Sequence, residues 1–378
     1  MAVMTAGSPH ATAGGLSKTE VDSVLASLWR QKRAALADEL RAEMACKEIT
    51  WQGKRMRWLE RTFGDAPPNG RSLWISLHGG GGAPAAVNDG QWQNQIRLYR
   101  PAEGIVVAPR APTNTWNLWH ESHIDPMLDR LIAGFVATRG VDPDRVYLLG
   151  YSAGGDGVYQ IAPRAADRWA AAAMMAGHPN ESKPTGLRNL PFFIFAGSND
   201  SGYNRNRASA EWGKQLDELQ KTDPDGYPHR TTLYPELGHW MNGNDREALP
   251  LMASRTRNPW PKKVVWLQDD VTHERFYWLA VPKGTAIKDR LIRASIDGQT
   301  IALESNLPGK VLLRLSDELL DLNKPVRVTS AGRTLFSGPL PRTPDAIRIS
   351  LDDRPDPRTA ATASLEVSLE PSDPTGKP

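Results

Sequence analysis

Cysteine is almost missing from this chain of 378 residues, in which Cys46 is the only one. A single cysteine excludes an intrachain disulfide and leaves the redox compartment open. Residues 1–15 hold no apolar core of the length that a signal peptide needs, and the longest apolar run, 169–176, is far too short to span a bilayer. The sequence therefore predicts a soluble protein, cytoplasmic as the chain stands, or secreted or periplasmic if a leader has been removed.

An excess of charge of one sign is missing as well. The chain has 46 basic and 43 acidic residues, and its last 118 residues hold 17 basic and 16 acidic ones. A nucleic-acid-binding module would show a basic patch or stripe, so nucleic acid is a poor candidate partner. Thirteen tryptophans, in contrast, are many for one chain and indicate aromatic surfaces as well as aromatic packing.

The length favours two domains over one. Ser17 and Glu20 have the spacing of a capping box, and apolar residues then recur with helical period to about Ala45. This helix is expected either to lie on the following domain or to form a solvated N-terminal arm. The expected division of the chain is a disordered N-terminus over 1–16, a helix over 17–46, an α/β domain over 47–258, a β domain over 261–370 and a disordered tail over 371–378.

The α/β expectation rests on continuous apolar runs that alternate with helical stretches. A strand pair turns at Gln52-Gly53. Buried strands are expected over 73–77, 104–109, 145–150, 169–177, 191–197 and 230–235, with helices over about 126–138, 153–162 and 208–219. Continuous apolar strands between helices are typical of a mostly parallel sheet that is buried on both faces.

After about Pro261 the pattern changes to short runs in which apolar and polar residues alternate. These runs include KVVWL (263–267), TIALES (300–305), KVLLRL (310–315), VRVTS (326–330) and IRISL (347–351). Asp297-Gly298 and Ala331-Gly332 stand where hairpin turns are expected. The sequence therefore predicts a second, all-β domain of sandwich type, with no long helix and no constellation of reactive residues.

Residues 150–154, GYSAG, have the Gly-x-Ser-x-Gly spacing of a nucleophile elbow. In such an elbow a strand turns sharply into a helix and lifts the serine hydroxyl clear of the sheet. A glycine-rich turn between a strand and a helix would explain the same five residues. The interpretation therefore depends on chemical partners elsewhere in the chain.

A catalytic partner is expected just after the carboxyl end of a parallel strand, because functional loops gather there. His239 follows the strand at 230–235, and Asp200 follows the strand at 191–197. Other histidines and carboxylates nearby precede a strand or lie on the helix beyond it. The chain order Ser152, Asp200, His239 is the one expected of an α/β-hydrolase.

The tract LHGGGG (77–82) follows an early strand, where this fold places the loop that stabilises an oxyanion. Glycines let backbone N–H groups approach the developing charge without side chains in the way. Gly79 or Gly80 is expected to donate one N–H and Ala153 the other, with His78 bracing the loop. A phosphate-binding loop is not favoured, because no Lys-Ser or Lys-Thr follows the tract.

Together LHGGGG (77–82), GYSAGG (150–155), GSND (197–200) and GHW (238–240) resemble the α/β-hydrolase superfamily. More narrowly, they are similar to the dienelactone-hydrolase, polyhydroxybutyrate-depolymerase and feruloyl-esterase-like group of serine esterases. The resemblance covers roughly residues 47–258 and implies a Ser152–His239–Asp200 triad, hydrolysis through an acyl-enzyme and no cofactor. The chain departs from secreted members in lacking a signal peptide and disulfides, and the β domain is not part of the minimal family.

Loops at the same edge supply candidates for substrate binding. The residues expected to bind substrate are Trp116, Trp119, His178 and Trp240. The two tryptophans of the 115–123 loop would form an aromatic subsite or be buried beneath the loop. His120, His123 and Asp125 are too few for a metal site, so none is predicted. Asp156, in the first turn of the helix after the elbow, is expected to be structural.

These features favour a serine carboxylic ester hydrolase that acts on a small or polymeric ester. A serine peptidase of the prolyl-oligopeptidase type has the same fold and triad order, although no propeller-sized N-terminal domain precedes this one. A non-catalytic binding protein is the third candidate, but binding gives no reason to hold a serine, an aspartate and a histidine together. The sequence leaves the oligomeric state open and predicts no membrane span.

Overall fold

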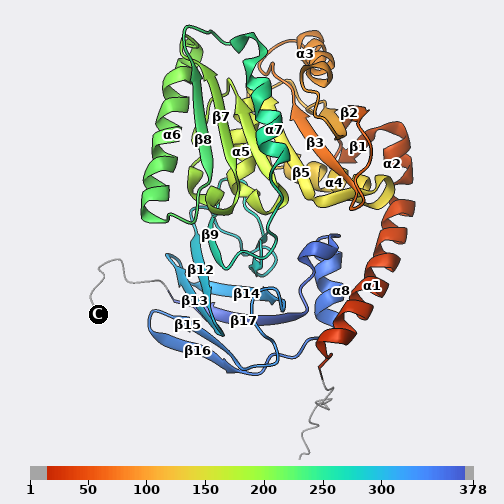
Figure 1. The fold of residues 1–378 in the computed structure, drawn as a ribbon, viewed down its shortest axis with the longest axis vertical. Helices are drawn as coiled ribbons and strands as arrows, with labels where there is room; N and C mark the ends of the chain where they lie inside the picture. Colours follow the sequence, from red (N-terminus) through yellow and green to blue (C-terminus); the bar gives the residue numbers. More distant parts are fainter. Residues whose placement is uncertain (1–14, 371–378) are drawn as a thin grey trace, which may run out of the picture.

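The computed structural model describes residues 15–370, which form an α/β part and a β-rich part (Figure 1). The expected disordered tail over 371–378 lies outside the described residues, as does almost all of the expected disordered N-terminus over 1–16. Across residues 15–370, no helix has the length and apolar character needed to cross a membrane.

The α/β part is built on an eight-stranded sheet in the order β1-β2-β4-β3-β5-β6-β7-β8. Its strands are β1 (Glu48–Trp51), β2 (Lys54–Phe63), β3 (Arg71–Leu77), β4 (Gly104–Pro109), β5 (Val141–Tyr151), β6 (Ala171–Met175), β7 (Phe192–Gly197) and β8 (His229–Tyr234). β1 and β2 pair antiparallel, β2 pairs antiparallel with β4, and every pair from β4 to β8 is parallel. The expected mostly parallel sheet is confirmed.

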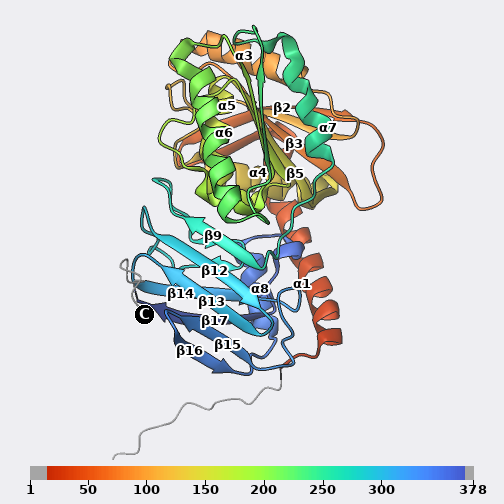
Figure 2. The ribbon, with the colours of Figure 1, turned by 60° about the vertical axis from the view of Figure 1, so that its left-hand side comes forward.

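Helices cover both faces of this sheet (Figure 2). They are α3 (Ala85–Leu98), α4 (Ile124–Arg139), α5 (Ala153–Arg164), α6 (Arg205–Thr222) and α7 (Ala248–Ala253), with short 3-10 helices η1 (Ala166–Arg168), η2 (Pro184–Asn189), η3 (Gly202–Asn204) and η4 (Met241–Glu247). α3 and α7 pack against a cluster that includes Trp74 and Tyr147, whereas α4, α5 and α6 pack against a cluster that includes Leu148 and Phe192. Burial on both faces explains why the central strands are continuous apolar runs.

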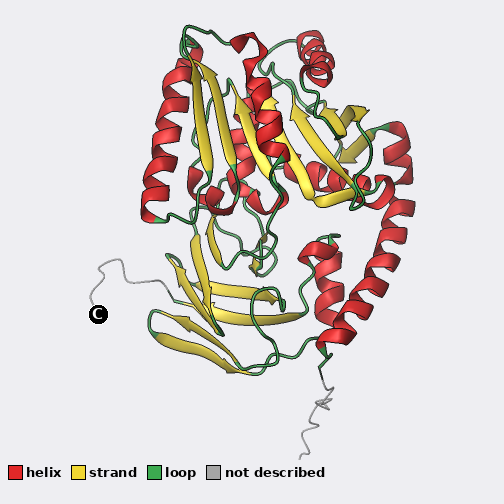
Figure 3. Cartoon of the chain, viewed as in Figure 1, coloured by secondary structure: helices red, strands yellow, loops and turns green. Residues whose placement is uncertain are grey.

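The β-rich part contains two further sheets (Figure 3). One has the order β16-β15-β13-β12-β9 and the other the order β10-β11-β14-β17. The strands are β9 (Lys263–Leu267), β10 (Arg275–Phe276), β11 (Leu279–Ala280), β12 (Leu291–Asp297), β13 (Thr300–Ser305), β14 (Gly309–Leu315), β15 (Val326–Ser330), β16 (Arg333–Gly338) and β17 (Ala363–Leu369), with a 3-10 turn η5 (Pro357–Thr359). Buried and exposed residues alternate along β12 and β13, so each strand turns one face to the core.

The prediction of a strand over 347–351 is wrong, because these residues lie in helix α8 (Pro344–Asp353). The Thr343 hydroxyl accepts the N–H of Ala346 and Pro344 occupies the first turn, which is a favourable helix start. Ile347 and Leu351, one turn apart, are both buried. The same pattern of apolar and polar residues therefore fits both a strand and a short amphipathic helix. The N-terminal cap at Thr343 favours the helix.

The N-terminal helix α1 (Lys18–Glu39) joins the two parts, and α2 (Arg41–Cys46) follows it. The expected capping box is present between Ser17 and Glu20. Figure 1 shows α1 running along α8 and on to the α/β part. Val21 packs with α8, and Leu36 packs with Ala137 of α4. The alternative of a solvated N-terminal arm is therefore wrong for residues 18–46.

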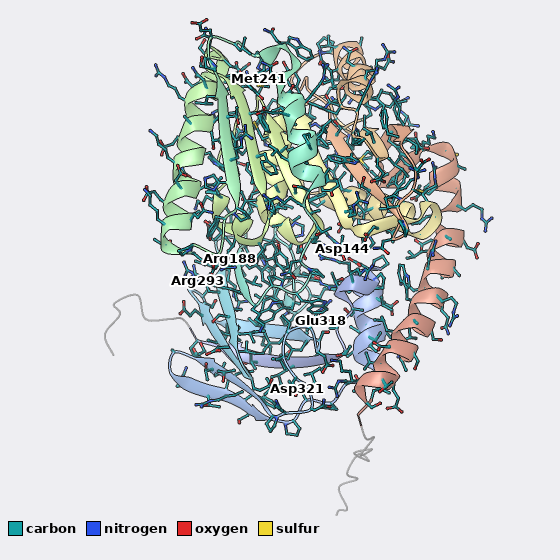
Figure 4. The ribbon with its side chains drawn as sticks, viewed as in Figure 1. Asp144, Arg188, Met241, Arg293, Glu318 and Asp321 are labelled. Atoms are coloured by element: carbon teal, nitrogen blue, oxygen red, sulfur yellow. The ribbon has the colours of Figure 1, made fainter. Side chains whose placement is uncertain are left out.

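The β-rich part lies at the edge of the large sheet where the parallel strands begin. Asp167, just before β6, pairs with Arg354, and Arg188, just before β7, donates to the carbonyl of Lys263. Figure 4 shows Arg188 beside the β-rich part and Met241, which follows β8, at the opposite end of the α/β part. The carboxyl ends of the parallel strands therefore lie at the end of the α/β part away from the β-rich part.

Candidate active site

Ser152 stands at a sharp turn between β5 and α5. Its backbone has φ 58° and ψ −123°, which is strained for a residue with a side chain. A Cβ on Gly150 would lie 2.2 Å from the Gly154 carbonyl oxygen, and a Cβ on Gly154 would lie 2.0 Å from the Leu77 carbonyl oxygen. Both glycines are therefore required for the chain to turn here, which is the geometry of a nucleophile elbow.

Three side chains from separate loops form a hydrogen-bonded chain at this turn. His239 Nε2 lies 3.0 Å from Ser152 Oγ, and His239 Nδ1 lies 2.7 Å from Asp200 Oδ2. Asp200 follows β7 and is buried, whereas His239 follows β8 and is half-buried. β5, β7 and β8 run in the same direction, so their carboxyl ends bring the three residues to one edge.

The carboxylates further along the chain have other partners. Asp217 lies 3.2 Å from His229 Nε2, and Asp223 accepts from the Arg188 guanidinium at 2.7 Å. Arg188 lowers the pKa of Asp223. Neither carboxylate is bonded to His239, so Asp200 alone of these three occupies the position that orients the imidazole.

The glycine tract after β3 wraps against the serine. A Cβ on Gly79 would lie 3.1 Å from Ser152 Cβ, so only a glycine fits there without displacing its neighbour. Gly80 has φ +112°, and a Cβ on it would lie 2.3 Å from Asn88 Oδ1. Asn88 in turn accepts the N–H of Gly81 at 2.8 Å, which fixes the loop. Within residues 15–370, no protein acceptor takes the N–H of Gly80 or of Ala153.

His78 holds this loop in place. The Ala111 N–H donates to His78 Nε2 at 3.1 Å, so the proton of the neutral ring is on Nδ1, which donates to the Gly79 carbonyl at 2.6 Å. Burial lowers the pKa of His78 to about 4, so the ring is neutral at physiological pH. Because the C=O and N–H of a trans peptide point in opposite directions, holding the Gly79 carbonyl also fixes the Gly80 N–H.

Asp156, one turn into α5, supports the loop after β6. Its carboxylate accepts the N–H of His178 at 2.6 Å. Burial raises the pKa of Asp156 to about 6. His178 itself is half-buried, and its Nδ1 accepts the N–H of Asn180 at 3.0 Å. Asp156 therefore holds a candidate substrate-binding residue in place through its carboxylate, while its backbone N–H donates to the Ser152 carbonyl at 3.0 Å.

The three tryptophans expected to bind substrate divide into two groups. Trp116 is 63% exposed beside Gly82 of the glycine tract, and Trp240 is 48% exposed beside His239. Trp119, in contrast, is fully buried, and its indole N–H donates to the His78 carbonyl at 2.9 Å. The prediction that Trp119 binds substrate is therefore wrong, because its ring packs beneath the loop and leaves no face for a ligand.

Two tyrosines on the loops of the site were not predicted from the sequence. The Tyr151 hydroxyl donates to the His239 carbonyl at 3.1 Å, and the two rings lie 5.2 Å apart, so Tyr151 braces the histidine loop. The position of Tyr151 inside the GYSAG motif is the sequence signal that could have identified it. Tyr203 is 79% exposed on the loop that follows Asp200. A tyrosine three residues after a predicted acid is a weak signal, because nothing in the sequence shows that it is exposed.

The histidine and aspartate side chains near residues 120–125, which could have suggested a metal site, have protein partners instead. Asp125 is buried and pairs with Arg164 at 2.8 Å and with His273 of the β-rich part at 2.9 Å. Burial would raise the pKa of Asp125, but Arg164 and His273 lower it to about 2. His123 lies 3.3 Å from Glu121. In the described part of the chain, no group of three or more histidine, cysteine or acidic side chains is placed to hold a metal ion.

The strand order, the elbow after β5 and the three polar residues at the carboxyl edge define an α/β-hydrolase fold. The sequence matches no protein-family model and no curated protein. The structure is similar to a thermostable esterase, with 21% identity over 56% of this chain and 62% of that one and a TM-score of 0.44.

Two further solved structures are similar over about the same region. A poly(3-hydroxybutyrate) depolymerase from Bordetella parapertussis has 15% identity over 58% of this chain and 93% of its own, with a TM-score of 0.41. Dipeptidyl peptidase 4 from Porphyromonas gingivalis has 12% identity over 55% of this chain and 35% of its own, with a TM-score of 0.39. In all three cases the similarity covers little more than half of this chain.

Proposed function

We propose that this chain is a serine carboxylic ester hydrolase that works through an acyl-enzyme. The observation that carries the proposal is the hydrogen-bonded chain from Ser152 Oγ through His239 to the buried Asp200, placed on a strained elbow. A strained backbone and a buried carboxylate both cost stability, and catalysis explains why they are kept at one place.

In the first half-reaction Ser152 Oγ attacks the ester carbonyl carbon, and its proton passes to His239 Nε2, 3.0 Å away. Asp200 accepts the Nδ1–H of His239, which holds the productive tautomer and stabilises the imidazolium. The tetrahedral intermediate then breaks its bond to the alcohol oxygen, which takes the proton from His239. Water repeats the sequence on the acyl-serine and releases the carboxylic acid.

The Gly80 and Ala153 amides are the proposed oxyanion donors. Ala153 follows Ser152 in the chain, and Gly80 follows Gly79, whose Cβ position lies 3.1 Å from Ser152 Cβ. Neither the Gly80 nor the Ala153 N–H has a protein acceptor within residues 15–370. His78 and Asn88 hold the glycine tract before substrate arrives, so little reorganisation is needed when the charge develops. A single oxyanion donor contributes roughly 10²–10³-fold to turnover in enzymes of this kind.

The proposed substrate surface is a rim of exposed aromatic side chains. Trp116, Tyr203 and Trp240 lie on the loops that follow β4, β7 and β8, the same loops that surround Ser152. Exposed aromatic rings offer apolar faces to a ligand at little conformational cost. We assign the acyl or alcohol part of the ester to this rim, with His178 as its polar neighbour.

The test compares esters with a peptide on the same protein. We expect the chain to hydrolyse p-nitrophenyl acetate or butyrate, to leave a chromogenic glycyl-proline anilide intact, and to be labelled by a fluorophosphonate probe. Ser152→Ala should abolish labelling and nearly all turnover while its melting temperature stays close to that of wild type. Peptide cleavage without ester cleavage would favour the peptidase, and labelling that persists in Ser152→Ala would place the nucleophile elsewhere.

A further inference from the structure

A cavity lies on the α3 and α7 face of the large sheet, away from the elbow. It has a volume of about 760 Å³, which is in the range of pockets for small molecules. Arg145 of β5 is among its lining residues, and Ser152 follows seven positions further along this extended strand, which is roughly 20 Å. The cavity is therefore not part of the proposed active site.

Four arginines line this cavity, with a single acidic side chain among them. The arginines are Arg97, Arg100, Arg145 and Arg246, and the acidic residue is Glu103. Glu103 pairs with Arg145 at 2.9 Å and also accepts the Ser72 N–H at 3.0 Å, so its charge is already in use. Within residues 15–370, Arg97 and Arg100 have no acidic partner. The cavity thus holds positive charge that the protein does not compensate.

The C-terminus of helix α3 does not account for this charge. A helix end carries a partial charge of about −0.5, which one arginine in the last turn more than balances. Arg97 occupies that turn, and Arg246 donates from Nε to the Leu98 carbonyl at 3.1 Å. Arg100 lies past the helix end, so the partial negative charge of the helix does not account for its guanidinium group.

The remaining lining is apolar and rigid. Trp74 forms part of it, and its indole N–H is held by Ser72 Oγ at 2.8 Å while its ring lies 4.2 Å from that of Tyr147. Pro101 and Pro250 add stiff walls. A ligand that fits must therefore combine an apolar body with an anionic head group, and arginine is the side chain best suited to carboxylate or phosphate.

We propose that this cavity, lined by the four arginines, is a binding site for a small amphipathic organic anion, a carboxylate or a phosphate ester with an apolar or aromatic body. The site is separate from the ester-hydrolysing centre and does not depend on it. Binding neutralises the free guanidinium groups of Arg97 and Arg100 and covers the apolar wall at Trp74.

The first experiment titrates the full chain with 8-anilinonaphthalene-1-sulfonate and, in parallel, with the uncharged analogue N-phenyl-1-naphthylamine. The anionic probe should bind, and Arg97→Gln with Arg100→Gln should raise its dissociation constant about tenfold or more. A matched pair, Arg30→Gln with Arg333→Gln, removes two exposed arginines elsewhere and should leave the constant unchanged. Equal binding by both double variants, or equally tight binding of the uncharged analogue, would overturn the proposal.

A second variant tests the cavity without changing charge. Ala253 lines it and is exposed, so Ala253→Trp should fill the space, leave the fold intact and weaken binding of the anionic probe. Displacement of the probe by benzoate or by phenyl phosphate then distinguishes a carboxylate source from a phosphate source. An Ala253→Trp variant that binds as wild type, or a probe that neither anion displaces, would contradict the assignment.

Discussion

At the residue scale, Asp200 and Asp217 each lie within hydrogen-bond distance of a histidine nitrogen, but only Asp200 reaches a histidine that also faces a serine. Asp200→Asn should slow ester turnover by on the order of 10³–10⁴-fold, because an amide favours the wrong tautomer of His239. Asp217→Asn is the matched control and should change turnover little. Steady-state kinetics on p-nitrophenyl butyrate give the comparison, and equal losses would reject Asp200 as the orienting acid.

Asp156 makes a separate prediction, about stability and pH. Its pKa is raised to about 6 by burial, so the folded chain binds this proton more tightly than the unfolded chain does. The stability it contributes is complete below about pH 4 and is lost as the pH rises through 6. Asp156→Asn keeps an oxygen for the His178 N–H and removes the titrating group. The free energy of unfolding of the variant should therefore exceed that of wild type by an amount that grows to roughly 1–3 kcal/mol by pH 8.

The measurement is the free energy of unfolding of both proteins from pH 4 to pH 8. Asp225→Asn, at an exposed position, serves as the control and should show no such trend. A difference between Asp156→Asn and wild type that stays constant with pH would show that Asp156 titrates in the fold as it does in the unfolded chain.

At the element scale, the contact between α1 and α8 is what attaches the N-terminal helix to the β-rich part. Ile347 of α8 is fully buried in it, whereas Ile349 on the same helix is 62% exposed. Ile347→Ala should lower the free energy of unfolding by about 2–4 kcal/mol, because it leaves a cavity. Ile349→Ala should stay within about 0.5 kcal/mol of wild type. Similar effects in chemical denaturation would mean that α8 does not pack through Ile347.

At the scale of the whole molecule, buried ion pairs bind the two parts together. Asp167 pairs with Arg354 and accepts the Tyr277 N–H at 3.0 Å, and all three residues are buried. Burial would raise the pKa of Asp167, but Arg354 and Arg168 lower it well below its usual range. Removing one partner of a buried ion pair leaves the other charge buried and unpaired, which lowers the free energy of unfolding by about 3–5 kcal/mol.

A chain that ends at Pro259 keeps Ser152, Asp200 and His239. It loses Arg354, which pairs with Asp167, and His273, one of the two partners of Asp125. We expect this truncation to give little soluble, cooperatively folded protein, despite its complete set of proposed catalytic residues. Arg354→Ala in the full chain should lower the melting temperature while kcat/KM per folded molecule stays near that of wild type. A stable truncation would show that the interface is dispensable, and a folded Arg354→Ala protein without activity would link the β-rich part to catalysis.

The sequence by itself determined the local features whose causes are local. The capping box at Ser17, the parallel strands with their apolar runs and the glycines of the elbow could all be read from neighbouring residues. The rule that parallel strands bring their carboxyl ends to one edge also selected Ser152, Asp200 and His239, which the structure places in hydrogen-bond contact. Strand direction and chain order are enough for that selection, so it needed no knowledge of packing.

Tertiary structure alone decided what depends on burial and on partners distant in sequence. Trp116 and Trp119 stand on one loop, yet one is exposed and the other buried, because only Trp119 packs under His78. The alternating pattern of residues 347–351 suits a strand, and its helix forms against α1, more than 300 residues earlier in the chain. The β-rich part lies at the edge opposite Ser152 for the same reason: its buried ion partners precede the strands, and no local pattern records where those partners meet.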